Sequence, residues 1–205
     1  MSSVSSSIIE DIDGMQKLGL ASMAFFYCDF RDEQKKGSRG LLSSWLAQLC
    51  HQSDAYSDIV SNFYLGHGNG SRQPSDDALI GCLKEILKLP GQAPVYLIMD
   101  ALDECPLASS LSSPRDKVLM VVEKLIDPQF PNTRICITSR PETDIKAVLC
   151  PLIFRSTSLH DESGQMEDIN DYIKFVVNTD RTMRRWKVTE KQLVIDVLTN
   201  KADGM

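Results

Sequence analysis

The apolar positions of this chain alternate between short dense runs and longer stripes at helical spacing. Three apolar runs predict the strands of a parallel sheet, and the length and aromatic content of the first favour a strand buried on both faces. They span residues 21–30, 95–99 and 134–138. A fourth and shorter apolar run, residues 152–154, predicts one more strand. Helical patterns lie between these runs, so the sequence predicts βαβ units and a doubly wound α/β fold.

The stripes predict amphipathic helices on both sides of that sheet. They lie within residues 8–15, 41–49, 79–87, 118–126 and, more briefly, 144–149. Residues 65–75, with three glycines, predict a surface loop, after which Asp76 and Asp77 stand at the positive end of the next helix. From residue 162 onward the pattern is only helical. One helix carries Ile169, Tyr172, Ile173 and Val176, and a capping box of Thr189 and Gln192 predicts the start of the other, which carries Leu193, Val194, Val197 and Leu198.

Composition places the chain among soluble globular proteins. Its 22 basic and 28 acidic residues give a net charge of −6, which argues against a nucleic-acid binder or a membrane-surface binder. The six cysteines form no CxxC pair, so they predict reduced thiols rather than a zinc site or disulfides. No apolar segment has the length of a signal peptide core or a membrane span, and we expect a cytoplasmic protein.

The end of the second predicted strand carries the sharpest chemical signal. The run VYLIMD ends in Asp100, and Asp103 and Glu104 follow within one turn of chain. In open α/β sheets the ligand site lies at the carboxyl ends of the strands. Asp100 is suited to hold Mg²⁺ beside nucleotide phosphates, and Asp103 or Glu104 to orient or deprotonate an attacking water. A strand followed by a solvated acidic turn is the alternative.

The third predicted strand delivers polar groups to the same edge. RICI is followed by Thr138, Ser139 and Arg140, and the planar cation of Arg140 is suited to reach a terminal phosphate. The alternative is an ordinary strand-to-helix turn, with Pro141 at the first helical position. Two such strand ends in succession favour a binding site over chance.

Other candidate sites have less support. The three histidines are isolated, so a hydrolase triad is not indicated. The basic and aromatic residues within 181–187 are typical of a solvated helix end, with nucleic-acid contact as the alternative.

These motifs, DALDE and ITSRPE, preceded by FFYCDF and LLSSWLAQLC, resemble the NACHT domain of STAND P-loop NTPases. The resemblance is to the nephrocystin-3-like N-terminal type found in fungal NOD-like receptor proteins. It implies a P-loop NTPase sheet sandwiched by helices over residues 1–160 and the beginning of a helical lid over residues 161–205. It also implies Mg²⁺ and ATP (or GTP) as ligands, Asp100 as the metal residue, Asp103 and Glu104 as catalytic residues, and Thr138, Ser139 and Arg140 as nucleotide-binding residues.

The sequence departs from that family in one respect. No G-x-x-x-x-G-K-[ST] motif, the Walker A loop whose amides and lysine hold the phosphates, occurs in the 205 residues. In the family's sheet the strand before that loop lies between the sensor strand and the strand predicted at residues 152–154. Without it, we expect residues 134–138 to form an unpaired edge or to be brought together with residues 152–154.

Three readings follow from this departure. The chain is a truncated member of a nucleotide-regulated signalling switch without independent NTPase activity, a non-catalytic interaction module, or an incomplete gene product. We expect its partners to be copies of itself or related NACHT proteins, with no nucleic acid and no membrane.

Overall fold

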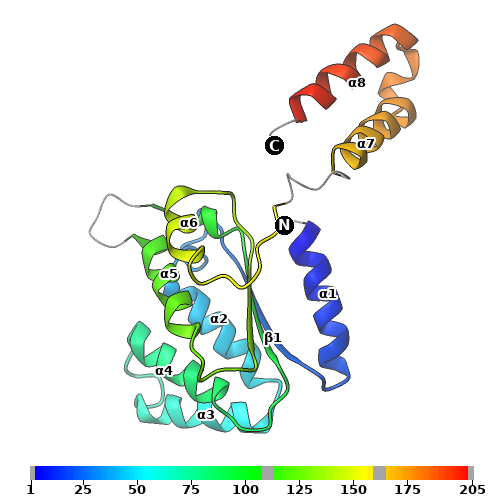
Figure 1. The fold of residues 1–205 in the computed structure, drawn as a ribbon. Coiled ribbons are helices and arrows are strands. Elements are labelled where there is room, and N and C mark those ends of the chain that lie inside the picture. Colours follow the sequence, from blue (N-terminus) through cyan, green and yellow to red (C-terminus); the bar gives the residue numbers. More distant parts are fainter. Residues whose placement is uncertain (1–2, 108–112, 159–164, 203–205) are drawn as a thin grey trace. The chain divides into compact units, whose positions relative to one another are not determined.

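The computed structural model describes residues 3–107, 113–158 and 165–202 (Figure 1). The chain forms two compact units, Met1–Leu152 and Ile153–Met205. The first unit holds a parallel sheet flanked by helices, so the α/β class predicted from the sequence is confirmed.

Three strands form the sheet of the first unit, in the order β1-β2-β3. They are β1 (Ser22–Tyr27), β2 (Val95–Asp100) and β3 (Thr133–Ile137). Both pairings are parallel, with Tyr27 opposite Asp100 and Met99 opposite Ile137. The three strands therefore end at the same level, and the residues that follow them gather at one edge.

Helices cover both faces of this sheet (Figure 1). They are α1 (Ser3–Lys17), α2 (Ser38–Cys50), α3 (Asp54–Gly66), α4 (Asp76–Leu87), α5 (Pro114–Leu125) and α6 (Thr143–Leu149). On one face, Ile12 of α1 packs with Met23 and Ile98 of the strands. On the other face the larger core includes Trp45 of α2 and Leu83 of α4, both fully buried. Burial on both faces explains why β1 and β2 read as continuous apolar runs, while β3 is only partly buried.

Local capping fixes the starts of two helices of the larger layer. The Ser75 hydroxyl accepts a hydrogen bond from the Ala78 N–H at the start of α4. At the start of α5, Ser113 and Asp116 form a reciprocal capping box, with Pro114 as the first helical residue. These contacts satisfy N–H groups that a helix leaves unpaired at its N-terminus.

Two features of the first unit differ from the sequence predictions. The helix α3 was not among the predicted elements, whereas the loop that follows it, from His67 to Ser75, agrees with prediction. The strand predicted at residues 152–154 is wrong: Leu152 ends a turn after α6, and the Phe154 side chain is fully exposed. A run of three apolar residues gains no strand stability without a neighbouring strand to pair with.

The second unit consists of α7 (Gln165–Thr179), the short 3₁₀ helix η2 (Thr182–Arg185) and α8 (Val188–Ala202). The two predicted helices are confirmed, but the capping box of Thr189 and Gln192 is not formed. Instead the N–H of Lys187 donates to the Glu190 carboxylate at 2.7 Å, and α8 begins at Val188.

None of the residues in the predicted apolar stripes of these two helices is fully buried. Ile173, Val176 and Val194 are partly buried, whereas Tyr172 and Leu193 are 69% and 64% exposed. The buried positions are instead Val177 of α7 and Ile195 of α8. The basic cluster at residues 181–187 is solvated, as predicted, apart from partial burial at Met183.

Candidate functional site

The ends of β2 and β3 converge on the carboxylate of Asp100. Asp100 is the last residue of β2 and is 4% exposed. Its Oδ1 atom accepts hydrogen bonds from the Thr138 hydroxyl at 2.6 Å and from the Ser5 hydroxyl at 2.7 Å. A strand end, the strand end beside it and the first turn of α1 thus bring three oxygen groups to one point.

The backbone after Asp100 turns sharply to place the next two acids. Ala101 adopts the left-handed conformation, with φ 55° and ψ 51°, which costs an alanine roughly 1 kcal/mol. Its N–H donates to the Thr138 hydroxyl at 3.0 Å, and the Leu102 N–H donates to the Thr138 carbonyl at 3.0 Å. Thr138 therefore holds the turn that leads into the 3₁₀ helix η1 (Leu102–Glu104).

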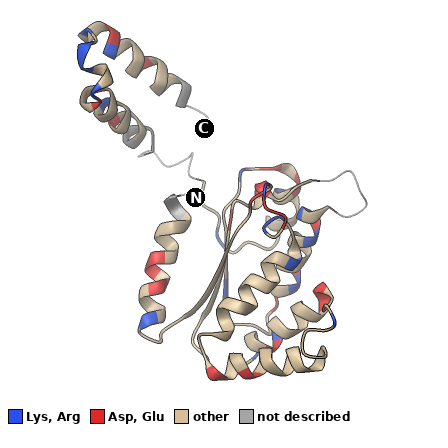
Figure 2. Cartoon of the chain, turned by 180° about the vertical axis from the view of Figure 1, so that it is seen from behind, with Lys and Arg blue, Asp and Glu red and all other residues tan. Residues whose placement is uncertain are grey.

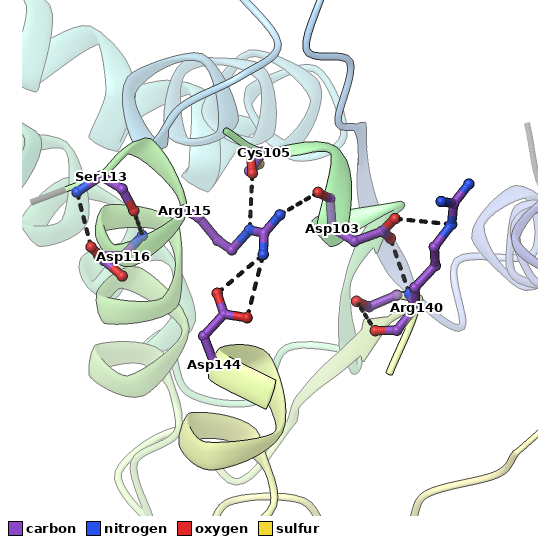
Figure 3. A network of polar contacts seen from close by, with 8 residues as sticks. Asp103, Cys105, Ser113, Arg115, Asp116, Arg140 and Asp144 are labelled. Atoms are coloured by element: carbon purple, nitrogen blue, oxygen red, sulfur yellow. Dashed lines mark hydrogen bonds and ion pairs between the residues drawn. The ribbon is translucent and has the colours of Figure 1, made fainter. Parts of the chain in front are cut away.

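Asp103 of η1 forms a two-point contact with Arg140 after β3 (Figure 3). The Arg140 backbone N–H donates to Asp103 Oδ1 at 3.0 Å, and Arg140 Nε lies 3.4 Å from Asp103 Oδ2. The Asp103 side chain is 11% exposed, whereas that of Arg140 is 82% exposed. The backbone contact fixes the loop after β3, and the exposed guanidinium keeps freedom to contact a ligand.

A buried arginine stabilises this arrangement from the protein interior (Figure 3). Arg115, in the first turn of α5, donates from Nε to the Cys105 carbonyl at 2.9 Å and from Nη2 to the Asp103 carbonyl. Its Nη1 atom lies 3.1 Å from the carboxylate of Asp144 in α6. Because Arg115 is 6% exposed, it links α5, α6 and η1 within the protein interior.

Beside these groups the surface is hollowed by a pocket of about 320 Å³. Its lining residues come from the segments that follow β1 and β3, from η1 and the two residues after it, and from α5: Phe30, Asp103, Glu104, Cys105, Pro106, Arg115 and Arg140. The pocket therefore brings carboxylates together with the exposed guanidinium group of Arg140.

The structure brings four of the six residues predicted for the site into two contacting pairs. Asp100 contacts Thr138, and Asp103 contacts Arg140. Glu104 lines the pocket. The Ser139 hydroxyl donates to the Arg140 carbonyl at 2.7 Å, a local turn contact on the exposed surface.

Two residues of the site escaped the sequence analysis. Ser5 lies in a serine-rich stretch, whose only signal was its place just ahead of an apolar helical stripe. Arg115 read as an ordinary charged residue in the first turn of a helix, and nothing in the local pattern signals its burial.

The site is electrostatically negative around Asp100. Burial, and secondarily the charge of Asp100, raise the pKa of Tyr27 at the end of β1. The same two causes raise the pKa of Cys136 in β3. Deprotonating either neighbour would add a second negative charge close to the first.

The carboxylate of Asp100, with the two hydroxyls beside it, suits a hard cation whose coordination shell is completed by a bound ligand. Mg²⁺ commonly binds through one or two carboxylates while phosphates and waters complete its shell. One buried carboxylate with hydroxyls at 2.6 and 2.7 Å fits that pattern. The described residues contain no group of three or more His, Cys, Asp or Glu side chains placed to hold a metal by themselves.

Comparison with protein families gives one match. The family described as nephrocystin 3, N-terminal, matches residues 2–140. The chain belongs to this nephrocystin 3 N-terminal family. The matched range contains α1, the whole sheet and every residue predicted for the site. No curated protein and no solved structure gives a significant match.

Two further observations concern the helices of this family member. In the part of the chain that the structure describes, no helix combines the length and apolar character needed to span a membrane. Basic and acidic residues are interspersed along the helices (Figure 2).

Proposed function

We propose that this chain carries the magnesium-binding carboxylate and the phosphate-sensing arginine of a NACHT-type nucleotide switch. We also propose that it does not hydrolyse nucleotide by itself. The observation that carries the proposal is the convergence on Asp100 of the Thr138 and Ser5 hydroxyls. The Asp103–Arg140 pair and the pocket, formed by the residues that follow these strands, add to it. Membership of the nephrocystin 3 N-terminal family agrees with this assignment.

Each residue has a role in the proposal that follows from its chemistry. Asp100 holds Mg²⁺ with its buried carboxylate, and the hydroxyls of Ser5 and Thr138 orient that carboxylate. Asp103 and Glu104 position water at the mouth of the pocket. Arg140, with its exposed guanidinium, contacts a phosphate and exchanges its pairing with Asp103 for that contact. Ser139 shapes the turn that presents Arg140.

The absence of turnover follows from what these residues do not supply. Phosphoryl transfer depends almost entirely on positioning the phosphates and neutralising their charge. The 205 residues contain no Walker A motif, which does most of that positioning in P-loop NTPases. We therefore assign to this chain a role in sensing nucleotide, ATP or GTP, rather than in consuming it.

The test is magnesium-dependent binding of fluorescent ATP and GTP analogues to the purified chain. We expect saturable binding that is lost in Asp100→Asn and Arg140→Ala. Arg134→Ala is the matched control, because Arg134 lies near the opposite end of β3, where it donates to the carbonyls of Pro131 and Thr133. Folding of each variant is checked by circular dichroism.

Two results would contradict the proposal. A folded chain that binds neither analogue lacks the nucleotide site. Release of phosphate from ATP or GTP above the level of the Asp100→Asn variant would contradict the absence of turnover.

The second candidate is a non-catalytic interaction module. It is favoured by one observation, the position of β3 at an edge of the sheet. Failure of nucleotide binding together with self-association through that edge would favour it.

A further inference from the structure

Two buried thiols meet beside the candidate site. Cys28 follows β1, and Cys105 follows η1. Their sulfur atoms lie 3.3 Å apart, within an S–H···S hydrogen bond, although 77 residues separate them in sequence. Cys28 is 4% exposed and Cys105 is fully buried. Both are free thiols.

Backbone hydrogen bonds hold both residues in place. The Cys28 N–H donates to the Asp100 carbonyl at 3.0 Å, which continues the pairing of β1 with β2. The Cys105 N–H donates to the Leu102 carbonyl at 3.1 Å, and its own carbonyl accepts from Arg115 Nε at 2.9 Å. A disulfide bond is about 2.05 Å long, so the sulfur atoms need to approach by only about 1.3 Å.

The surroundings of Cys105 favour its thiolate form. The hydrogen bond with Cys28 lowers the pKa of Cys105, burial opposes this, and the positive charge of Arg115 lowers it further. Of the two residues, Cys105 lines the pocket of about 320 Å³. Because its side chain is fully buried, a small oxidant reaches its sulfur when the chain opens locally beside that pocket.

We propose that Cys28 and Cys105 are a modification site that closes to a disulfide when the chain meets a peroxide. The Cys105 thiolate attacks one oxygen of hydrogen peroxide, the O–O bond breaks, and sulfenic acid and hydroxide form. The hydroxide takes up the proton released from Cys105 and becomes water. The Cys28 sulfur then attacks the sulfenic sulfur, and the departing hydroxide leaves as a second water with the proton of Cys28. In total two thiols and one peroxide give one disulfide and two waters.

The new bond would join the end of β1 to the turn that carries Asp103. It would close a loop of 77 residues, which removes conformational freedom from the unfolded chain. We expect the midpoint of thermal unfolding to rise by roughly 5–10 °C. A thiol such as dithiothreitol would reverse the rise.

The experiment treats the full chain with hydrogen peroxide, unfolds it, blocks the remaining thiols and analyses its peptides by mass spectrometry without reduction. We expect a peptide pair that links Cys28 to Cys105 and has lost two hydrogen atoms. The rise in unfolding midpoint should be absent in Cys28→Ala and in Cys105→Ala. Cys82→Ala is the matched control: Cys82 is also buried and free, and burial and the charge of Glu85 raise its pKa to about 11. This variant should keep both the bond and the rise.

Three results would overturn the proposal. In the first, both thiols are found blocked after peroxide treatment. In the second, Cys105 is linked to a different cysteine. In the third, the link forms as fast in chain unfolded by urea as in folded chain, so that the fold does not select the pair. Because the readout is a covalent bond, it is independent of whether the chain binds nucleotide.

Discussion

At the scale of single residues, the buried side chain of Arg115 fixes the position of η1 in the site. It donates to two backbone carbonyls, those of Asp103 and Cys105, in the protein interior. A buried acceptor that loses its donor costs its full desolvation penalty rather than the small net value of a hydrogen bond. The position of η1, and with it of Asp103, therefore depends on a side chain that does not belong to any strand end.

We predict that Arg115→Met lowers the free energy of unfolding by about 2–3 kcal/mol, because the substitution keeps an unbranched stem and removes every donor. Urea unfolding measures the loss. Arg31→Met is the control, since Arg31 is exposed and pairs with Asp29 at the surface, where ion pairs contribute little. Equal losses in the two variants would show that Arg115 has no special structural role.

At the scale of elements, the close approach of α2 to the preceding loop depends on a glycine. A Cβ atom at Gly40 would lie 1.7 Å from the carbonyl oxygen of Gln34. The exposed Gly81 in α4 has open space around the same position. The packing around Gly40 therefore requires a glycine, whereas the packing around Gly81 leaves room for a side chain.

We predict that Gly40→Ala destabilises the chain and that Gly81→Ala stabilises it by about 0.5–1 kcal/mol. Alanine favours a helix over glycine at both positions, but at Gly40 the steric overlap with backbone exceeds that gain. Thermal unfolding of the two variants against the unchanged chain provides the measurement. Stabilisation by Gly40→Ala would show that the loop at Gln34 yields without cost.

The capping box of α5 makes stability depend on pH. Hydrogen bonds from the backbone N–H and then the side chain of Ser113 lower the pKa of Asp116 below its ordinary value of 3.8. A carboxyl whose pKa is lower in the folded state stabilises the fold above its unfolded pKa. That contribution is lost as pH falls through the folded pKa.

We predict that Asp116→Asn is less stable than the unchanged chain near pH 7. The difference should stay constant down to about pH 5 and shrink below about pH 4, where the carboxyl becomes protonated. Urea midpoints measured from pH 7 to pH 3 test this. A difference that persists unchanged at pH 3 would mean that charge plays no part in the cap.

The elements that the sequence predicted are those whose burial is continuous or strictly periodic. The strands β1 and β2 read as apolar runs because helices cover both of their faces, whereas the residues of β3 are only partly buried or, at Arg134, exposed. Helix α3 lacked such a signal, since Tyr56 is its one fully buried side chain and Ile59 and Phe63 are only partly buried.

The residues of the candidate site also differ in whether the sequence could predict them. Asp100 and Arg140 were predictable because they follow strand ends, whose position the topology fixes. Ser5 and Arg115 were not, because their contacts join segments far apart in sequence, 95 residues in the case of Ser5 and Asp100. Tertiary contacts of this kind leave no local pattern.

At the scale of the whole molecule, β3 has a single neighbour, β2, among the described strands. The register pairs Leu97 with Ile135 and Met99 with Ile137. In a parallel ladder alternate residues bond to each side, and the N–H of Val95 donates to the carbonyl of Asn132. The peptide groups of Ile135 and Ile137 therefore point away from β2, toward the open edge.

We predict that the purified chain associates with itself as its concentration rises, because an open apolar edge is a template for another strand. Sedimentation velocity over a range of concentrations measures this. Ile135→Pro should shift the chain toward monomer and keep its fold, since proline there removes an N–H that points outward. Cys136→Pro is the matched control one residue along: its N–H bonds to β2, so this variant should lose stability instead.

The two proline variants separate pairing at the edge from general stickiness. Association driven by exposed side chains elsewhere would persist in Ile135→Pro. A chain that stays monomeric at every concentration and melts cooperatively at high temperature would contradict the prediction, because it would mean that the edge is protected. In that case the peptide groups of Ile135 and Ile137 that point away from β2 would have to be covered or solvated in a way that no incoming strand can displace.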